Sequence, residues 1–150
     1  MSKETVDNCS ENHLGFIKEI VAKQKLYGLK GSHGWAVAQS NIYEATEAYL
    51  FWQSESLAQA CAKEGWINYI PTAIPLCEFL EDWCLAVFDE QNLIGIDWDF
   101  YKCGNEIESL SLAKDLLATL KESQNNELNF TKYSSLQDFE NWIDKVLEEE

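Results

Sequence analysis

The sequence predicts a single α+β domain in which a small, mostly antiparallel sheet packs against about four or five helices. The 150 residues are enough to bury a core, and 46% of them are hydrophobic. Short glycine-bounded apolar runs alternate irregularly with helical stripes, which favours α+β over a regular βαβ array. We expect residues 1–9 to be a flexible N-terminus, residues 10–122 the core domain, and residues 123–150 a connector and a C-terminal helix packed on that core.

The helices are predicted from apolar residues that recur at helical spacing. Segments with this pattern cover about residues 11–25, 54–64, 76–88, 109–121 and 135–147. The segment 76–88 is the clearest, because its apolar residues form one stripe while Glu78, Glu81 and Asp82 occupy the opposite side.

The helix over residues 54–64 has a start signal and a stop signal. Ser54 is expected to cap its first turn, and Gly65 is expected to end it. Within it, we expect Leu57, Ala60 and Cys61 to face inward, with Ala58 as a further candidate.

The strands are predicted from short apolar runs that are separated by turn signals. Such runs cover about residues 25–30, 35–39, 48–52, 66–70 and 93–98. The first two flank the turn Gly31-Ser-His-Gly34 and are typical of a β-hairpin. The run 93–98 is expected to lie at or near the centre of the sheet. Residues 128–133 are expected to be a short strand or an extended arm.

Charge is the property that bears most directly on function. The formal net charge is −15, from 26 acidic and 11 basic side chains, and every one of the latter is Lys. Without the guanidinium fork of Arg, this negative field disfavours nucleic acid and anionic membranes as partners. A basic protein would instead be attracted. The alternative is that the charge only keeps the protein soluble.

The cysteine pattern indicates a reducing compartment. Cys9, Cys61, Cys77, Cys84 and Cys103 are odd in number and include no C-x-x-C pair, so neither a disulfide framework nor a zinc site is expected. No signal peptide and no apolar run of membrane-spanning length is recognisable. We therefore expect a cytoplasmic protein without a cofactor or a bound metal.

Catalytic constellations are scarce, so an enzyme is not expected. His33 lies in the Gly31–Gly34 turn and His13 near a helix start, and both are expected to face solvent. Asp97 and Asp99 alternate around Trp98, so on a strand their carboxylates would share one face. Such a pair could hold Mg²⁺ or Ca²⁺ or serve in hydrolysis, but the ligand spacing of a calcium loop is missing.

Partner recognition is the leading interpretation of the acidic and aromatic residues. Trp83 and Trp142 lie on helical stripes and are expected in the core, whereas Trp35, Trp52, Trp66 and Trp98 are expected to be half-exposed. Trp98 between two aspartates is the preferred interface anchor, because desolvated aromatics concentrate binding energy. The predicted partner-binding residues are Asp97, Trp98, Asp99, Asp89, Glu90 and Trp35.

Core aromatics, turn glycines and a helix start together form a recognisable pattern. Its segments are Leu26–Lys30, Gly34–Ala36, Leu50–Trp52, Ala58–Ala60, Trp66, Ile74–Leu80 with Trp83, Leu93–Gly95 and Leu112–Leu117. Over about residues 12–120 the chain resembles the bacterial proteins grouped as domain of unknown function 2750. The resemblance implies a small α+β bacterial domain and implies no reaction.

We therefore expect a non-catalytic, acidic binding protein that neutralises a basic protein partner, most concretely an immunity protein for a bacterial toxin. The alternative is a small regulatory or ligand-binding domain that acts as a homodimer and buries its exposed aromatics on itself. A hydrolase built on Asp97 and Asp99 is a third hypothesis.

Overall fold

A computed structural model describes residues 14–99, 104–123 and 135–149, and its strands form two sheets. One sheet has the order β2 (Gly34–Trp35), β1 (Lys25–Gly31) and β5 (Ile70–Pro75). The other has the order β3 (Val37–Gln39), β4 (Glu47–Phe51), β6 (Leu93–Ile96) and β7 (Asn105–Glu108). Among the strands of the described residues, only β4 and β6 pair in parallel, so the predicted α+β domain with a mostly antiparallel sheet is confirmed.

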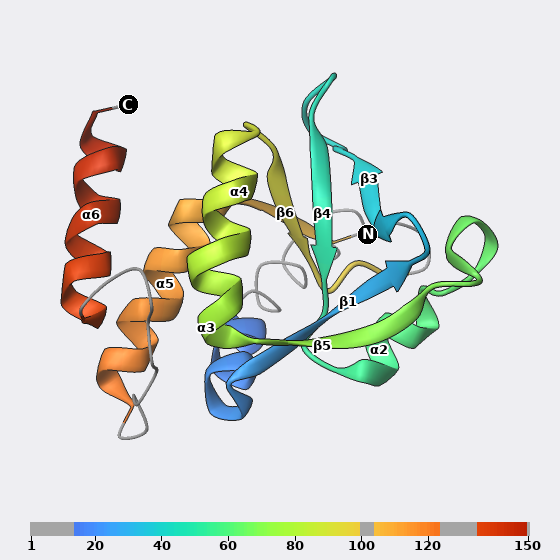
Figure 1. Cartoon of the computed structure of the whole chain (residues 1–150), viewed down its shortest axis with the longest axis horizontal. Coiled ribbons are helices and arrows are strands. Elements are labelled where there is room, and N and C mark those ends of the chain that lie inside the picture. The colour runs from blue at the N-terminus through green and yellow to red at the C-terminus, as the bar shows by residue number, and fades with distance from the viewer. Residues whose placement is uncertain (1–13, 100–103, 124–134, 150) are drawn as a thin grey trace, which may run out of the picture.

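Most of the helices cover one side of the four-stranded sheet: residues 14–23, α3 (Leu76–Glu78), α4 (Cys84–Asp89), α5 (Ser109–Glu122) and α6 (Leu136–Glu148). The short helix α2 (Glu55–Ala60) packs instead on β1 and β5 of the other sheet. In Figure 1, α4 lies next to the sheet, α5 lies against α4, and α6 is farthest from the strands. Within the described ranges, no helix combines the length and the apolar character that a bilayer span requires.

The predicted hairpin is present, and its second strand passes from one sheet to the other. β1 and β2 pair in the register Lys30↔Trp35, and His33 in the turn is exposed, as expected. At Ala36 the chain changes partners: its N–H donates to the carbonyl of Leu29 at 2.8 Å, and its carbonyl accepts from the N–H of Leu50 at 3.3 Å. The two sheets are therefore continuous through one bent strand.

β6 occupies the central position that its apolar sequence predicts. Gly95 pairs with Leu50 of β4 on one side and with Glu106 of β7 on the other. A second link joins the sheets, because Tyr27 of β1 and Trp52 exchange two backbone hydrogen bonds of 2.8 Å. β7 is not predicted from the sequence, since its Asn-Glu-Ile-Glu run has no apolar stretch.

The strand predicted over residues 66–70 is wrong. That segment is a 3₁₀ turn, η1 (Glu64–Trp66), followed by further turns, and the strand instead begins at Ile70 as β5. β5 lies at the edge of its sheet, and Pro71 and Pro75 are four residues apart. Their missing N–H groups therefore fall on the same side of the strand, which an edge strand tolerates.

The helix predicted over residues 54–64 is shorter than expected. Its start is confirmed, because the side chain of Ser54 accepts a hydrogen bond from the N–H of Leu57 at 3.2 Å. The helix ends at Ala60, so Gly65 does not terminate it. Ala60 and Leu57 are exposed, the latter by 43%, while Cys61 is buried as expected. The inward face is set by the position of the core and not by side-chain size.

The clearest predicted helix is confirmed and contains a π-helical turn, η2 (Phe79–Trp83), between α3 and α4. The expectation that Glu81 lies on its solvent side is wrong, because Glu81 is only 3% exposed. Pro75 stands at its N-cap, where a missing N–H is harmless. The ring of Phe79 packs edge-to-face on Phe51 of β4 at a centroid distance of 4.9 Å. Trp83 packs on the same ring at 5.3 Å, so this helix is fixed to the sheet by aromatic contacts.

The buried side chains form two clusters on opposite faces of the four-stranded sheet. Phe51 belongs to the larger cluster with the helices, and the preceding residue, Leu50, belongs to the smaller one, because side chains alternate along a strand. The smaller cluster contains Trp52 and Trp98, which are 0% and 2% exposed. The expectation that these two rings are half-exposed is therefore wrong, whereas Trp35 and Trp66 are half-buried as expected.

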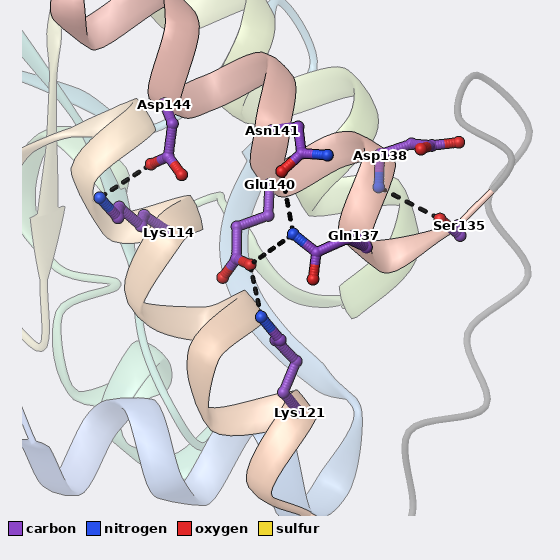
Figure 2. A network of polar contacts seen from close by, with 8 residues as sticks. All are labelled: Lys114, Lys121, Ser135, Gln137, Asp138, Glu140, Asn141 and Asp144. Carbon is purple, nitrogen blue, oxygen red and sulfur yellow. Dashed lines mark hydrogen bonds and ion pairs between the residues drawn. The ribbon is translucent and has the colours of Figure 1, made fainter.

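The C-terminal helix packs on α5 (Figure 2). Ser135 caps it by accepting from the N–H of Asp138 at 3.1 Å. Its side chains Phe139 and Ile143 are fully buried in the larger cluster. Polar contacts flank this apolar seam: Lys121–Glu140 at 2.6 Å, Lys114–Asp144 at 2.8 Å, and Gln137 to Asn141 at 2.9 Å. The N-terminal segment 1–9, His13, Cys9, Cys103 and the arm predicted over 128–133 lie outside the described residues.

Apolar packing, and not the ion pairs, should hold α6 in place. We expect Ile143→Ala to lower the free energy of unfolding by about 2–5 kcal/mol, because it leaves a cavity in the core. Lys114→Met should leave the urea midpoint nearly unchanged, since the paired side chains of Lys114 and Asp144 are 49% and 43% exposed. Urea unfolding followed by tryptophan fluorescence measures both, and a larger loss for Lys114→Met would contradict this expectation.

Candidate functional site

The predicted partner-binding residues do not form one site. Asp97, Trp98 and Asp99 follow the C-terminal end of β6, whereas Asp89 and Glu90 precede its N-terminal end. A strand of four residues spans roughly 13 Å, so the two groups lie at opposite ends of the sheet. The remaining residue, Trp35, lies in the other sheet on β2.

Trp98 is a core residue, so its predicted role as an interface anchor is wrong. It is 2% exposed, and its Nε1 donates to the carbonyl of Asn105 at 3.0 Å. Its own carbonyl accepts from Trp52 Nε1 at 2.8 Å and from the thiol of Cys61 at 3.1 Å. The ring therefore joins β7 to the segment after β6 and offers no surface to a partner.

Asp97 and Asp99 do not share a face, because β6 ends at Ile96. Asp97 has a φ of 52°, a left-handed conformation that breaks the alternation of a strand. Its carboxylate accepts from the backbone N–H of Gln53 at 3.0 Å and also from the side-chain amide of Gln53. Burial raises the pKa of Asp97, while these hydrogen bonds act in the opposite direction. Asp97 therefore joins the ends of β4 and β6.

The side chain of Trp35 is occupied on both sides. Its ring meets Trp83 edge-to-face at a centroid distance of 5.0 Å, and Lys30 Nζ lies 5.4 Å from its centroid. A Cβ at Gly28 would lie 2.9 Å from the ring, so this glycine leaves the space that Trp35 fills. These contacts account for its burial without a partner.

Asp89 and Glu90 are exposed, as a recognition role requires. Glu90 Oε1 accepts from the hydroxyl of Tyr49 at 2.5 Å and from the amide of Asn92 at 3.4 Å. The hydrogen bond to Glu90, followed by burial, raises the pKa of Tyr49 to about 12. Glu90 is thus fixed in position, with Asp89 beside it at the end of α4.

A loop that the sequence analysis did not single out presents apolar side chains at the same end of the sheet. It joins β3 to β4 at the top of Figure 1. At its tip, Ile42 is 62% and Tyr43 58% exposed. An isolated apolar pair within a polar run between two strands was the only signal that could have identified it.

This loop is held in one conformation by hydrogen bonds at its base. The N–H of Asn41 donates to Glu106 Oε2 at 2.7 Å, and the hydroxyl of Ser40 donates to the other oxygen of Glu106. Ser40 Oγ also accepts from the N–H groups of Ile42 and Tyr43, both at 3.0 Å. The loop tip is therefore preorganised, which lowers the entropic cost of binding through it.

Acidic side chains surround the loop tip. β4 and β6 run in parallel, and β7 runs antiparallel beside β6. The N-terminal ends of β4 and β6 and the C-terminal end of β7 therefore lie at the same end of the sheet. We name the surface there the acidic face, and it consists of Ile42, Tyr43, Glu44, Glu47, Asp89, Glu90, Glu106 and Glu108. It brings the predicted residues Asp89 and Glu90 together with others that are distant in the sequence.

Adjoining hollows run along the acidic face. One of about 320 Å³ lies within the loop, a second of about 290 Å³ lies between the loop and β7, and a third of about 350 Å³ lies between α4 and α5. Ile42 and Tyr43 line the first and second, while Leu93 and Glu108 line the second and third. Among the described residues that line these hollows there is no Lys. A basic, convex partner surface would fit this arrangement in shape and charge.

The chemistry available to the described residues is limited. In the described part of the chain, no group of three or more His, Cys, Asp or Glu side chains is placed to hold a metal ion. Cys61 and Cys84 are buried, and burial raises the pKa of both thiols. A raised pKa disfavours the reactive thiolate.

Asp97 provides a test of the pKa argument. The pKa of Asp97 is raised in the folded state, so the folded protein binds a proton at this carboxyl more readily than the unfolded chain does. Protonation of Asp97 therefore stabilises the fold at low pH, and this stabilisation is lost as the pH rises through the folded-state pKa. Asn mimics the neutral acid and tolerates a positive φ. We therefore expect the melting temperature of Asp97→Asn, relative to wild type, to increase from about pH 4 to about pH 7. Asp99→Asn, at an exposed position, is the matched control, and an equal trend in both variants would contradict the prediction.

Comparison with known proteins identifies a family but no activity. The family model described as "Protein of unknown function (DUF2750)" matches residues 13–116. This confirms the resemblance inferred from the turn glycines and core aromatics. The matched range contains the whole acidic face and ends within α5, so α6 lies beyond it. No curated protein and no solved structure matches the chain.

Proposed function

The chain belongs to the DUF2750 family of proteins of unknown function, and we propose that it is a non-catalytic acidic protein that binds and neutralises a basic protein partner. The observation that carries this proposal is the preorganised loop tip of Ile42 and Tyr43, which stands exposed among carboxylates. A large exposed apolar pair costs solubility unless it is covered by a partner. Tyr is also enriched among the residues that dominate interface energies.

The net charge of the chain favours a partner of opposite, positive charge. With a net charge of −15 and no Arg, the protein repels polyanions and attracts cationic surfaces over a distance. The acidic face concentrates this field around the apolar tip, where rim charges accelerate association and exclude wrong partners.

The most concrete form of the proposal is an immunity protein for a bacterial toxin, acting in the cytoplasm. Toxins that cleave nucleic acids need a cationic substrate site, because they must neutralise phosphates. A row of carboxylates next to an aromatic side chain can occupy such a site as a substitute for the phosphates and a base. This mode of action needs no catalytic group in the inhibitor.

A second candidate function is a small regulatory or ligand-binding domain that acts as a homodimer. Ile67 and Ile70, each 67% exposed, favour it because they form a second apolar patch outside the acidic face. The acidic face itself is unsuited to a twofold interface, since each carboxylate would meet the same patch of the other subunit. Sedimentation equilibrium separates the two ideas: a stable dimer that Ile67→Ser/Ile70→Ser dissociates would favour the second.

The binding of a basic protein partner is tested by substituting one exposed apolar pair and using a second, equally exposed pair as the control. The tagged protein captures its partner from extracts of its own organism, and the purified partner is then titrated by calorimetry. We expect Ile42→Ser/Tyr43→Ser to weaken binding by roughly 30-fold or more, the effect of losing a hot spot. The equally exposed control Ile67→Ser/Ile70→Ser should bind like wild type.

Two further readouts accompany this test. Binding should weaken as the salt concentration rises, because the attraction is between exposed charges. If the partner is a toxin, co-expression of the wild type, and not of Ile42→Ser/Tyr43→Ser, should restore growth. An acidic partner, or unchanged binding by this variant, would contradict the proposal.

A further inference from the structure

The hollow between α4 and α5 differs from its neighbours on the acidic face. It has a volume of about 350 Å³ and lies where α4 ends, β6 begins and β7 passes into α5. This volume lies at the lower end of the range for small-ligand sites and suits a single extended side chain. Its walls include the half-buried apolar residues Phe88 and Leu93.

Two carboxylates stand at this hollow, and no Lys belongs to the described residues that line it. Asp89 comes from the end of α4 and Glu108 from the end of β7. Both are exposed, and within the described ranges neither takes part in an ion pair. Glu108 is also the N-cap residue of α5 and makes no side-chain capping hydrogen bond there.

An unpartnered buried hydroxyl belongs to the same hollow. Ser109 lines it and is only 2% exposed, and its Oγ has no hydrogen-bond partner in the described part of the chain. Buried polar groups are nearly always paired, so a lone one at the wall of a hollow requires an explanation, which a group bound there would supply. Together with the carboxylates, this hydroxyl offers acceptors to an N–H donor.

The sign of the expected ligand follows from the balance of charges. The N-terminus of α5 carries the equivalent of about half a positive charge, which by itself would favour an anion. Asp89 and Glu108 contribute two full negative charges at the same place, and the net charge of −15 adds to them. A cation is therefore favoured over an anion.

We propose that this hollow receives the side chain of a lysine or arginine of the basic partner, a step that rests on the function proposed above. The aliphatic stem of that side chain packs against Phe88 and Leu93, as long cationic side chains do on apolar surfaces. Its head donates to Asp89, Glu108 and Ser109. The loop tip then supplies apolar anchoring, and the hollow supplies recognition of one cationic residue.

The test uses capped amino acids as probes and amide chemical shifts as the readout. N-acetyl-lysine methylamide and N-acetyl-arginine methylamide should shift the amides of Leu93 and Ser109, whereas the neutral norleucine analogue and phosphate should not. Asp89→Asn/Glu108→Gln should weaken binding of the cationic probes by about threefold to tenfold. Glu55→Gln/Glu122→Gln, which removes the same charge elsewhere, is the matched control and should bind like wild type.

Ser109→Ala separates a ligand-binding hydroxyl from a structural one. If the hydroxyl accepts from the probe, its removal weakens probe binding and leaves the melting temperature of the free protein unchanged or higher. A lower melting temperature with unchanged probe affinity would overturn the assignment of Ser109. Equal weakening in both double variants would overturn the hollow itself, because only diffuse electrostatics would then operate.

The remaining outcomes are also decisive. Binding of phosphate in place of the cationic probes would overturn the proposal in favour of an anion site at α5. If spermidine bound and the capped lysine and arginine probes did not, the assignment of a protein side chain as the ligand would be overturned. If Ile42→Ser/Tyr43→Ser abolishes partner binding and no probe shifts these amides, this inference fails and the proposed function stands. If probes bind but no protein partner does, the hollow stands as a cation site and the proposed function fails.

Discussion

The placement of Trp98 depends on two positions that have no Cβ atom. A Cβ at Gly95 would lie 2.6 Å from its indole nitrogen, and one at Gly104 would lie 2.4 Å from the ring. With this space available, the backbone carbonyl of Trp98 accepts from the indole of Trp52. Trp52 in turn pairs with Tyr27 of the three-stranded sheet, so the placement of Trp98 supports one of the two links between the sheets, the other being the backbone of Ala36. A side chain larger than hydrogen at either glycine would collide with Trp98 and force it to shift.

The two ends of β6 have consequently different roles. At its C-terminal end the polar groups are matched internally, as Asp97 is with Gln53. At its N-terminal end, carboxylates and the loop tip face solvent. The hydrogen bonds there, such as that from Tyr49 to Glu90, hold these groups in position and leave them exposed. Under the proposed function, stability and recognition are thus separated by the length of one short strand. A partner can occupy the acidic face without disturbing the junction of the sheets.

Sequence reasoning succeeded where a segment's own pattern determines its structure. The helix over residues 76–88 has a long apolar stripe, and β6 has a continuous apolar run, so both were predictable. It failed where pairing with a distant strand decides the outcome. β7 has no strand-like composition and exists because it pairs with β6, and β5 tolerates two prolines because it is an edge strand. The loop tip was missed because the exposure of a residue depends on which other segments of the folded chain cover it.

The sequence by itself determined the fold class and the acidic, Arg-free character of the chain, because these follow from composition and local periodicity. It also determined the family, through the match of residues 13–116 to the family model. Only the tertiary structure decided which of the acidic residues lie close together. It buried Trp98, engaged Asp97 with Gln53, and placed Glu108 beside Asp89 through the pairing of β6 with β7. A carboxylate has the same charge wherever it stands in a sequence. Its neighbours and its exposure, which decide whether it can meet a partner, are set by chain segments far from it.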